Sequence, residues 1–481
     1  MTTNLMDGLR VHNAINLIES FNYPSGDPRG YVFIGKTTPW ENDREPPVPR
    51  NDVEEMVEIH NQMLSLIRIN DSDTFPLIRR KTWSQNVVYD YYRDDISYES
   101  PAYSGAITIK ESNFYVINSR NDVFVCLDNN GNSLSVNEPL NNSGDPFMTA
   151  DGYQWLLVYS LNTVLNTSYS TDNYIPVVST YDPRTSGEIN TVIIENKGSD
   201  YTDFPEGVGS RVRAYYCNVI GDGSGAVAKV HIDNTSVSKI EMVRRGVGYR
   251  HASLQFEVDK VYKSLYDLDN QINSLNPEGA GDLKTRVIIS PLGGWRLNLP
   301  LQLLSTDVGV FTKLDYNIDD FVNDIEFRQI GILQDPVITI TEDLGTLSAV
   351  FSARVIDSSD GEYLLGEEIT QLNANGLAKG TITYFDKDDG VIYFYQDYEE
   401  HNEKGVLTPF SGTERVKGSV SGKFTNVDTT FSGKFESATY IDGYAYPDLI
   451  RYTGNILYLS NIRPVRRNTS RAEKLTIIFN Y

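Results

Sequence analysis

Short apolar runs separated by turn-forming residues are the feature that most restricts the fold of this sequence. From about residue 76 onward, runs rich in Val, Ile, Phe and Tyr alternate with clusters of Asp, Asn and Gly. Examples lie at 106–109, 114–117, 123–127 and 153–159, and 128–131 is one of the turns. Short runs bounded by turn residues are typical of β-strands. The sequence therefore predicts a mainly β fold with two β-sandwich core domains, a few helices and two β-rich insertions.

Three segments have helical periodicity instead. Apolar residues recur every three or four positions in 11–21, 53–67 and 258–275. Before the second of these segments, Asn51 is placed to cap a helix, and Glu54 stands three residues later, which is the spacing of a capping box. We expect the apolar stripe of this helix, which begins at Val53, to pack on a sheet.

The order of these patterns divides the chain into five expected segments. They are an N-terminal β-sandwich with helices at 1–184, a β insertion at 185–257, a core β region at 258–345, a second β insertion at 346–436, and C-terminal strands that complete the core at 437–481. Within the first insertion, 189–201 and 237–249 share the pattern of a strand, a Gly, two residues and a Tyr. Two copies are too few for a solenoid, which needs about three or more repeats.

Charge and hydropathy restrict the possible partners. The formal net charge is −23, and such a field repels polyanions, so we expect no nucleic-acid partner. The basic run Arg463-Pro464-Val465-Arg466-Arg467 is interpreted as a solvated or salt-bridged loop. No apolar run approaches the ~18 residues of a membrane span, so no membrane insertion is expected. The first residues lack the basic and apolar regions of a secretory signal.

Residues that could carry chemistry are few. Cys126 and Cys217 are expected to be buried, unreactive thiols in a reducing compartment, and the five histidines lack metal-ligand spacing. The glycine-rich segment 221–225 lacks the Lys of a phosphate-binding loop, and we interpret it as a hairpin turn. The stretch Asp386-Lys387-Asp388-Asp389-Gly390 resembles the start of a calcium loop, but it lies between two apolar runs and favours a hairpin. We therefore assign no catalytic, cofactor-binding or metal-ligating residue, and we expect no enzyme and no cofactor.

The four tryptophans are candidates for core packing or for interface anchors. Core packing is favoured for Trp40 and Trp155, whereas Trp83 is left open. Trp295 follows a turn-like Pro-Leu-Gly-Gly segment, so we expect it to be exposed or in contact with a partner. The last strand, 474–479, is expected to pair within the chain rather than with a neighbour.

Several segments, taken in order, resemble a known family. The matching segments are 31–40 with Gly35, Pro39 and Trp40, then 125–128, 151–155, 327–332 with Pro336, 456–461 with Arg463 and Pro464, and 475–479. Lys36 stands where the family has Arg. In this order the segments resemble the peripheral baseplate wedge subunits of T-even-type contractile-tailed phages, the product of gene eight. The resemblance covers about 9–180, 285–345 and 440–481, and it leaves out both insertions.

The resemblance implies a structural role. The family fold is similar to two β-sandwich domains, and the family protein forms a homodimer in each wedge around a central hub. The expected partners are therefore a second copy, neighbouring baseplate wedge subunits and fibre-attachment proteins. The expected location is the virion tail baseplate, after synthesis in the bacterial host cytoplasm. Two alternatives remain open: a receptor-binding tail protein, with 346–435 as an adhesin-like insertion, and a glycan-processing tail protein that uses a pair of carboxylates.

Overall fold

The mainly β fold expected from the sequence is confirmed by the structure, a computed structural model that consists mostly of antiparallel sheets. The residues that the structure describes are 3–21, 30–178, 187–201, 204–206, 210–212, 214–277, 282–291, 293–314, 325–339, 345–357, 361–396, 407–435, 438–467 and 472–481. The chain divides into two compact units. Unit 1 comprises Met1–Ile15, Phe75–Gly309 and Phe479–Tyr481, and unit 2 comprises Asn16–Thr74 and Val310–Ile478. Each unit therefore combines segments that are distant in the sequence.

The first sheet of unit 2 has five strands. Its order is β20 (Thr346–Ser348), β2 (Met63–Arg68), β1 (Gly30–Gly35), β19 (Glu326–Gln334) and β30 (Asn455–Arg466). Every residue of β1 is buried, as expected for a central strand that lacks polar alternation. Gly331 in β19 faces Phe33 in β1, and a Cβ atom there would lie 2.2 Å from the Phe33 ring. The aromatic core of this sheet therefore requires a glycine at position 331.

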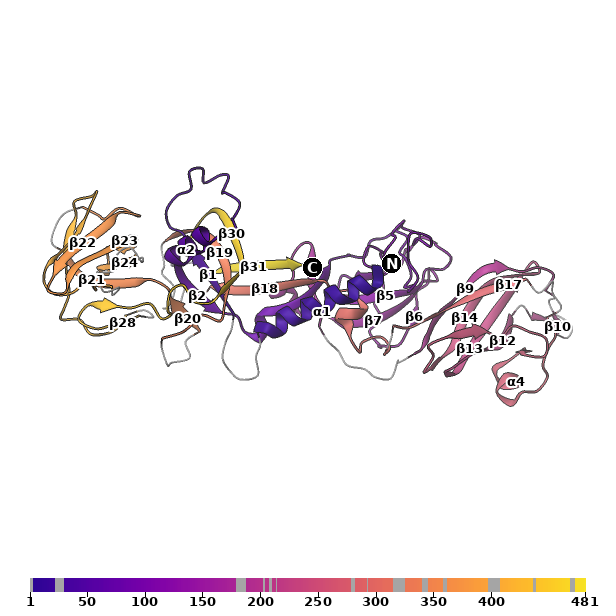
Figure 1. The fold of residues 1–481 in the computed structure, drawn as a ribbon. Coiled ribbons are helices and arrows are strands. Elements are labelled where there is room, and N and C mark those ends of the chain that lie inside the picture. The colour runs from indigo at the N-terminus through magenta and orange to yellow at the C-terminus, as the bar shows by residue number, and fades with distance from the viewer. Residues whose placement is uncertain are drawn as a thin grey trace. The chain divides into compact units, whose positions relative to one another are not determined.

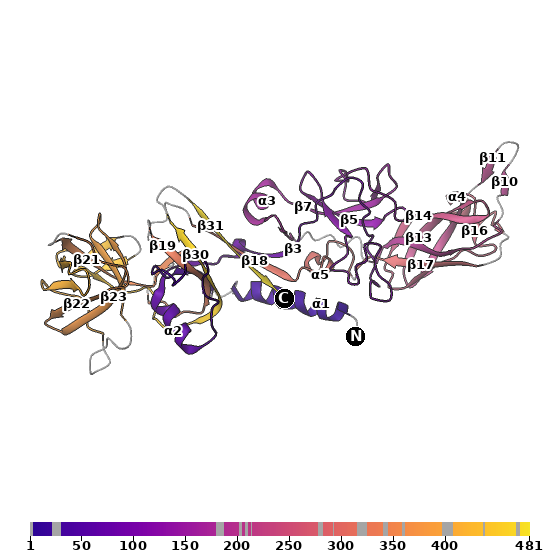
Figure 2. The same cartoon turned by 90° about the horizontal axis from the view of Figure 1, so that it is seen from above.

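The second sheet of unit 2 closes on itself. Its order is β24 (Val391–Tyr395), β23 (Gly376–Asp386), β22 (Glu368–Asn373), β25 (Arg415–Gly418), β26 (Phe424–Val427), β21 (Phe351–Asp357) and β29 (Tyr444–Ala445), and β21 also pairs with β24. Figures 1 and 2 show β21, β22 and β23 together in one group of strands. Phe351, Phe394 and Phe410 lie in its core. Closure leaves few free strand edges, which protects a small β module from edge-to-edge association.

In unit 1, one sheet is apolar on both faces. Its order is β4 (Tyr115–Ile117), β5 (Asp122–Asp128), β7 (Gln154–Ser160) and β6 (Phe147–Met148). Alternate residues of a strand point to opposite faces. Val123, Val125 and Leu127 of β5 accordingly belong to one core cluster, whereas Phe124 and Cys126 belong to another. The unbroken apolar run at 123–127 reflects this double burial.

A β module with its own core follows in unit 1. One sheet is β14 (Ser236–Val247), β13 (Ser224–Asp233), β12 (Ala214–Gly221) and β15 (Ala252–Leu254), with β16 (Val261–Tyr262) beside β12; two pairs are β9 (Ile189–Lys197) with β17 (Leu283–Ile289), and β10 (Phe204–Glu206) with β11 (Ser210–Val212). Figures 1 and 2 show β13, β14 and β17 in one group of strands. The expected hairpin at 221–225 is confirmed as the β12–β13 turn. The two matching patterns of the sequence also form matching turns, because Gly198 and Gly246 have φ of 63° and 64°.

The remaining elements are short, apart from the first helix. They are α1 (Thr3–Phe21), α2 (Val53–Gln62), η1 (Asp71–Asp73), β3 (Thr74–Arg79) with β8 (Tyr174–Pro176), α3 (Thr163–Tyr169), α4 (Leu265–Asn270), α5 (Leu299–Gln302), β18 (Asp307–Leu314) with β31 (Glu473–Asn480), and β27 (Gly433–Phe435) with β28 (Ala438–Tyr440). The pairing of β31 with β18 confirms that the last strand pairs within the chain.

The first predicted helix is confirmed, and the third needs adjustment. The stripe of α1 is buried at Val11, Ala14 and Phe21, as predicted. The helix predicted over 258–275 is wrong at both ends. Residues 261–262 form β16 and pair with β12, and Leu275 bridges to Val261, so only α4 is helical. No helix in the described ranges has the length and apolar character that a bilayer crossing requires.

Candidate interaction site at the Trp40 loop

The segment between β1 and α2, residues 36–52, stands out from the five-stranded sheet (Figure 1). We call it the Trp40 loop. It leaves the sheet at Gly35, where a Cβ atom would lie 2.9 Å from the carbonyl oxygen of Gln62. Lys36 then takes a left-handed backbone, with φ of 58°, and its N–H donates to the same Gln62 oxygen. This tight crossing ends the strand pairing and directs the chain outward.

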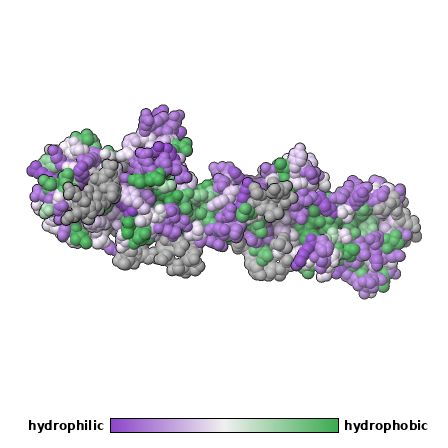
Figure 3. Space-filling model, in the orientation of Figure 1, coloured by the Kyte–Doolittle hydropathy of each residue, from purple (hydrophilic) through white to green (hydrophobic). Residues whose placement is uncertain are grey.

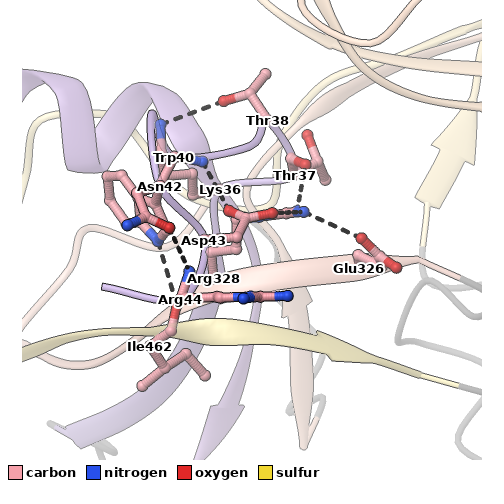
Figure 4. A network of polar contacts seen from close by, with 10 residues as sticks. All are labelled: Lys36, Thr37, Thr38, Trp40, Asn42, Asp43, Arg44, Glu326, Arg328 and Ile462. Atoms are coloured by element: carbon pink, nitrogen blue, oxygen red, sulfur yellow. Dashed lines mark hydrogen bonds and ion pairs between the residues drawn. The ribbon is translucent and has the colours of Figure 1, made fainter. Parts of the chain in front are cut away.

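Arg328 on β19 anchors the loop from below (Figure 4). Its side chain is only 4% exposed, and its Nε and Nη2 donate to the two carboxylate oxygens of Asp43 at 2.9 Å each. Nη1 donates to the carbonyl oxygen of Thr37 at 2.8 Å, and Nη2 lies 3.1 Å from Glu326. A two-pronged pair of this kind fixes geometry as well as charge. The hydrogen bond from Arg328 also holds the pKa of Asp43 below its usual value.

Trp40 joins this network from the loop itself (Figure 4). Its backbone N–H donates to Asp43 at 2.8 Å, and its indole N–H donates to the carbonyl oxygen of Ile462 at 3.2 Å. The Lys36 ammonium lies 4.4 Å from the centre of the indole ring, within the range of a cation–π contact. Burial lowers the pKa of this lysine. Asp43 therefore connects the buried arginine to the backbone of the loop.

The loop also covers part of an edge strand. Asn461 of β30 donates to the carbonyl oxygen of Pro47 at 2.9 Å, and Arg463 donates to that of Arg44 at 3.1 Å. The basic run at 463–467 is thus mostly strand, which corrects its assignment to a loop. Its ion pairing is seen at Arg467, which is buried with its Nε 3.4 Å from a carboxylate oxygen of Glu473. The sheet contacts of β30 place this run in a strand.

Exposed apolar side chains lie on and beside the loop, among the exposed carboxylates of Glu54 and Glu58. Val53 and Met56 on α2 are 77% and 40% exposed, and Val57 and Val48 are exposed as well. This corrects the expectation that the stripe packs on a sheet. The helix ends at Gln62 because β2 begins at Met63, so only Ile59 and His60 of α2 are buried.

The helix cap also differs from the prediction. Asp52, not Asn51, caps α2, and it accepts the N–H of Glu55 at 2.8 Å.

On the face drawn in Figure 3, hydrophobic residues are interspersed with hydrophilic ones. Val53, Met56 and Val57 of α2 and Val48 of the Trp40 loop are exposed apolar residues within ten positions of the sequence. We call these four residues the α2 face.

Segments that carry the family resemblance meet in this sheet. Residues 31–35, 327–332 and 456–461 lie on adjacent strands, with Val32 opposite Ile332 and Ile332 opposite Tyr458. Arg328 lies inside the second segment, but sequence reasoning gave it no role. The available signal was an arginine within an apolar strand, since a buried charge requires a partner.

The other tryptophans have different environments. Trp155 is fully buried, as predicted, and Trp83 is half-buried with its indole N–H 3.1 Å from Ser135 Oγ. Trp40 is half-buried in the network described above. The prediction for Trp295 is wrong: it is 1% exposed and packs edge-on against Tyr92, with ring centres 4.9 Å apart.

The motifs that could have carried chemistry are structural in the described residues. Cys126 and Cys217 are buried and free, and burial raises the pKa of both thiols. Residues 386–390 form the β23–β24 hairpin turn, in which Asp386 accepts the N–H groups of Asp388 and Asp389 at 3.0 Å each. Across the described ranges, no group of three or more His, Cys, Asp or Glu residues is placed to hold a metal.

Comparison with known proteins adds no relative: no family model and no curated protein matches this chain. The geometry of the site itself is that of a loop held rigidly by one buried arginine, beside an exposed apolar helix face.

Proposed function

We propose that this protein is a structural subunit of a contractile-tail baseplate wedge and that it assembles through non-covalent interfaces. The observation that carries the proposal is the Trp40 loop. Segments that resemble the wedge family come from distant parts of the sequence to adjacent strands at the base of this loop, and Arg328 in one of these segments anchors it. The exposed α2 face beside it supplies apolar area for a partner.

The physical properties of the loop suit an assembly role. Ordering a mobile segment on binding costs free energy, so a loop already held by several hydrogen bonds can bind with less loss. A concentrated apolar surface favours association because burial removes it from water. The net charge of −23 keeps free subunits soluble and steers them toward basic partner surfaces.

The proposed partners are a second copy of the chain, neighbouring wedge subunits and fibre-attachment proteins. Rearrangement before tail contraction would then move packed subunits as rigid bodies, since close-packed β cores do not deform continuously. The proposed location is the virion tail baseplate.

The test replaces apolar residues of the α2 face by acids. The double variant Val53→Asp/Met56→Asp adds two charges where the side chains are exposed, so the chain should fold and keep its circular dichroism spectrum. When the variant is the only copy in the infecting phage, we expect it to be missing from purified tails, as measured by quantitative mass spectrometry.

A matched control adds the same two charges elsewhere. Val164 on α3 and Leu372 on β22 are also exposed, and Val164→Asp/Leu372→Asp should enter tails at the wild-type level. Normal incorporation of the α2-face variant would contradict the proposed interface.

A further inference from the structure

A cleft of about 480 Å³ opens within unit 2, between the five-stranded sheet and the outer end of β23. Thr37, Ile325 and Glu326 form one wall, and residues 383–388 form much of the other. A smaller hollow of about 120 Å³ shares Thr37 and Thr383 with it. The larger hollow borders the base of the Trp40 loop at Thr37 and Glu326, but no residue of the α2 face lines either hollow.

The wall formed by β23 is an open strand edge. β22 pairs with β23 only between the point where Asn373 faces Gly376 and the point where Glu368 faces Thr381. The last backbone hydrogen bonds on that side of β23 join Ile382 to Gly366 and Glu367. Beyond Ile382, β23 pairs only with β24 among the described strands. Residues 383–386 therefore overhang the closed sheet with one side open. Such an edge is a template for one more strand.

Thr383 provides an independent sign that the cleft binds something. It is the residue at which the β23–β24 register shifts, and a bulge of this kind redirects a side chain. Thr383 is only 4% exposed, yet its Oγ1 has no hydrogen-bond partner among the described residues. A buried hydroxyl without a partner costs free energy. A ligand in the cleft would supply the missing partner, since Thr383 lines both hollows.

The charge of the cleft indicates the kind of ligand. Four carboxylates line it, from Glu326, Glu362, Asp386 and Asp388, against two cations, from Lys387 and Arg466. Lys387 pairs with Glu362 at 3.2 Å, and Glu326 pairs with the anchor Arg328 at 3.1 Å. Leu365, Tyr384 and Phe385 add apolar surface between these charges.

We propose that this cleft binds an extended, basic segment of a partner protein by adding it as a strand beside residues 383–386. The backbone of the segment would bond to the open edge, and its alternate side chains would face the acids and the apolar patch in turn. This inference does not depend on the baseplate assignment, because it uses only the cleft.

The experiment uses the full-length chain and a yeast-displayed library of random ten-residue peptides. We expect the selected peptides to contain Lys or Arg at every second position. They should bind the Glu362→Gln/Asp388→Asn variant about tenfold more weakly, as expected when close charge pairs are lost. A control with the same charge change outside the cleft, Asp71→Asn/Asp442→Asn, should bind like the wild type.

Two further measurements test the binding mode. In synthetic versions of a selected peptide, N-methyl groups on alternate residues remove the N–H donors along one edge of the extended strand. The pattern that blocks the edge facing β23 should abolish binding, and the other pattern should not. Thr383→Val removes the hydroxyl without changing the shape, so it should weaken binding without lowering the unfolding midpoint. The proposal is overturned if no peptide is selected, or if neither methylation pattern affects binding. It is also overturned if the Glu362→Gln/Asp388→Asn variant binds the peptides as tightly as the control variant.

Discussion

At the scale of single residues, one buried arginine organises the candidate site. Arg328 on β19 binds the Trp40 loop through Asp43 and Thr37 and also contacts Glu326 on its own strand, and Trp40 adds a bond to Ile462 on β30. The partners Arg328 and Asp43 are 285 positions apart, so no local pattern in the sequence joins them. Composition and periodicity describe neighbours along a chain, and this network is built from neighbours in space.

The arginine fork is expected to control the stiffness of the loop. Arg328→Lys keeps the charge but cannot reach both Asp43 oxygens and the Thr37 carbonyl oxygen. Amide hydrogen exchange at Trp40 and its neighbours should become at least about tenfold faster, or about 1.4 kcal/mol less protected. Arg120→Lys, at an exposed turn of unit 1, is the control and should leave the loop unchanged. Equal exchange in the two variants would refute the anchoring role.

His60 is expected to make unit 2 sensitive to acid. Burial, with a smaller contribution from Arg451, lowers the pKa of His60 to about 4. The unfolded chain takes up this proton near pH 6.5, well before the folded protein does. The contribution of His60 to the free energy of unfolding is therefore fully present above about pH 6.5. It falls by at most about 3 kcal/mol as the pH decreases toward 4.

The measurement is urea unfolding of the full chain between pH 7.5 and pH 4.5, with unit 2 followed by hydrogen exchange of its own peptides, because Trp83, Trp155 and Trp295 in unit 1 would also fluoresce. His60→Gln cannot titrate in this range, so its stability should depend less on pH than that of the wild type. Parallel pH profiles for the two proteins would show that the buried imidazole has no such effect.

At the scale of elements, the sequence predicted periodic features better than their environments. The run at 123–127 is a doubly buried strand, and the two Gly–x–x–Tyr patterns became two similar turns. In contrast, the apolar stripe of α2 has the period of a buried helix but faces solvent. Trp295 follows turn residues but is buried against Tyr92, about two hundred positions away. The spacing of apolar residues along the sequence shows which side chains of a segment could be buried. The tertiary contacts determine which of them are buried.

The Gly246 turn in unit 1 allows a matched test of this account. A Cβ atom at Gly246 would lie 2.6 Å from the carbonyl oxygen of Ser224, whereas at Gly225 nothing is nearer than 3.8 Å. Both glycines have positive φ, so Ala costs about 1 kcal/mol at either site from backbone strain alone. Gly246→Ala should therefore destabilise unit 1 by clearly more than Gly225→Ala, as measured by urea unfolding. Equal losses would mean that the close contact has no effect.

At the scale of the whole molecule, two compact units combine segments from both ends of the chain. The fold class followed from the sequence because strand runs and turn residues occur throughout it. The candidate site did not, because the anchor, the cleft and the exposed face each depend on residues that meet only after folding. The assembly role rests on the resemblance of ordered segments, together with the rigid loop at which several of them meet.

The most direct test of this role is the copy number of the chain in purified tails, measured by quantitative mass spectrometry against the sheath protein of one six-fold ring. We expect about two copies for every wedge, as a homodimer in each of the six wedges requires. Absence from the particle, or three copies for every wedge as a trimeric fibre would give, would contradict the wedge assignment.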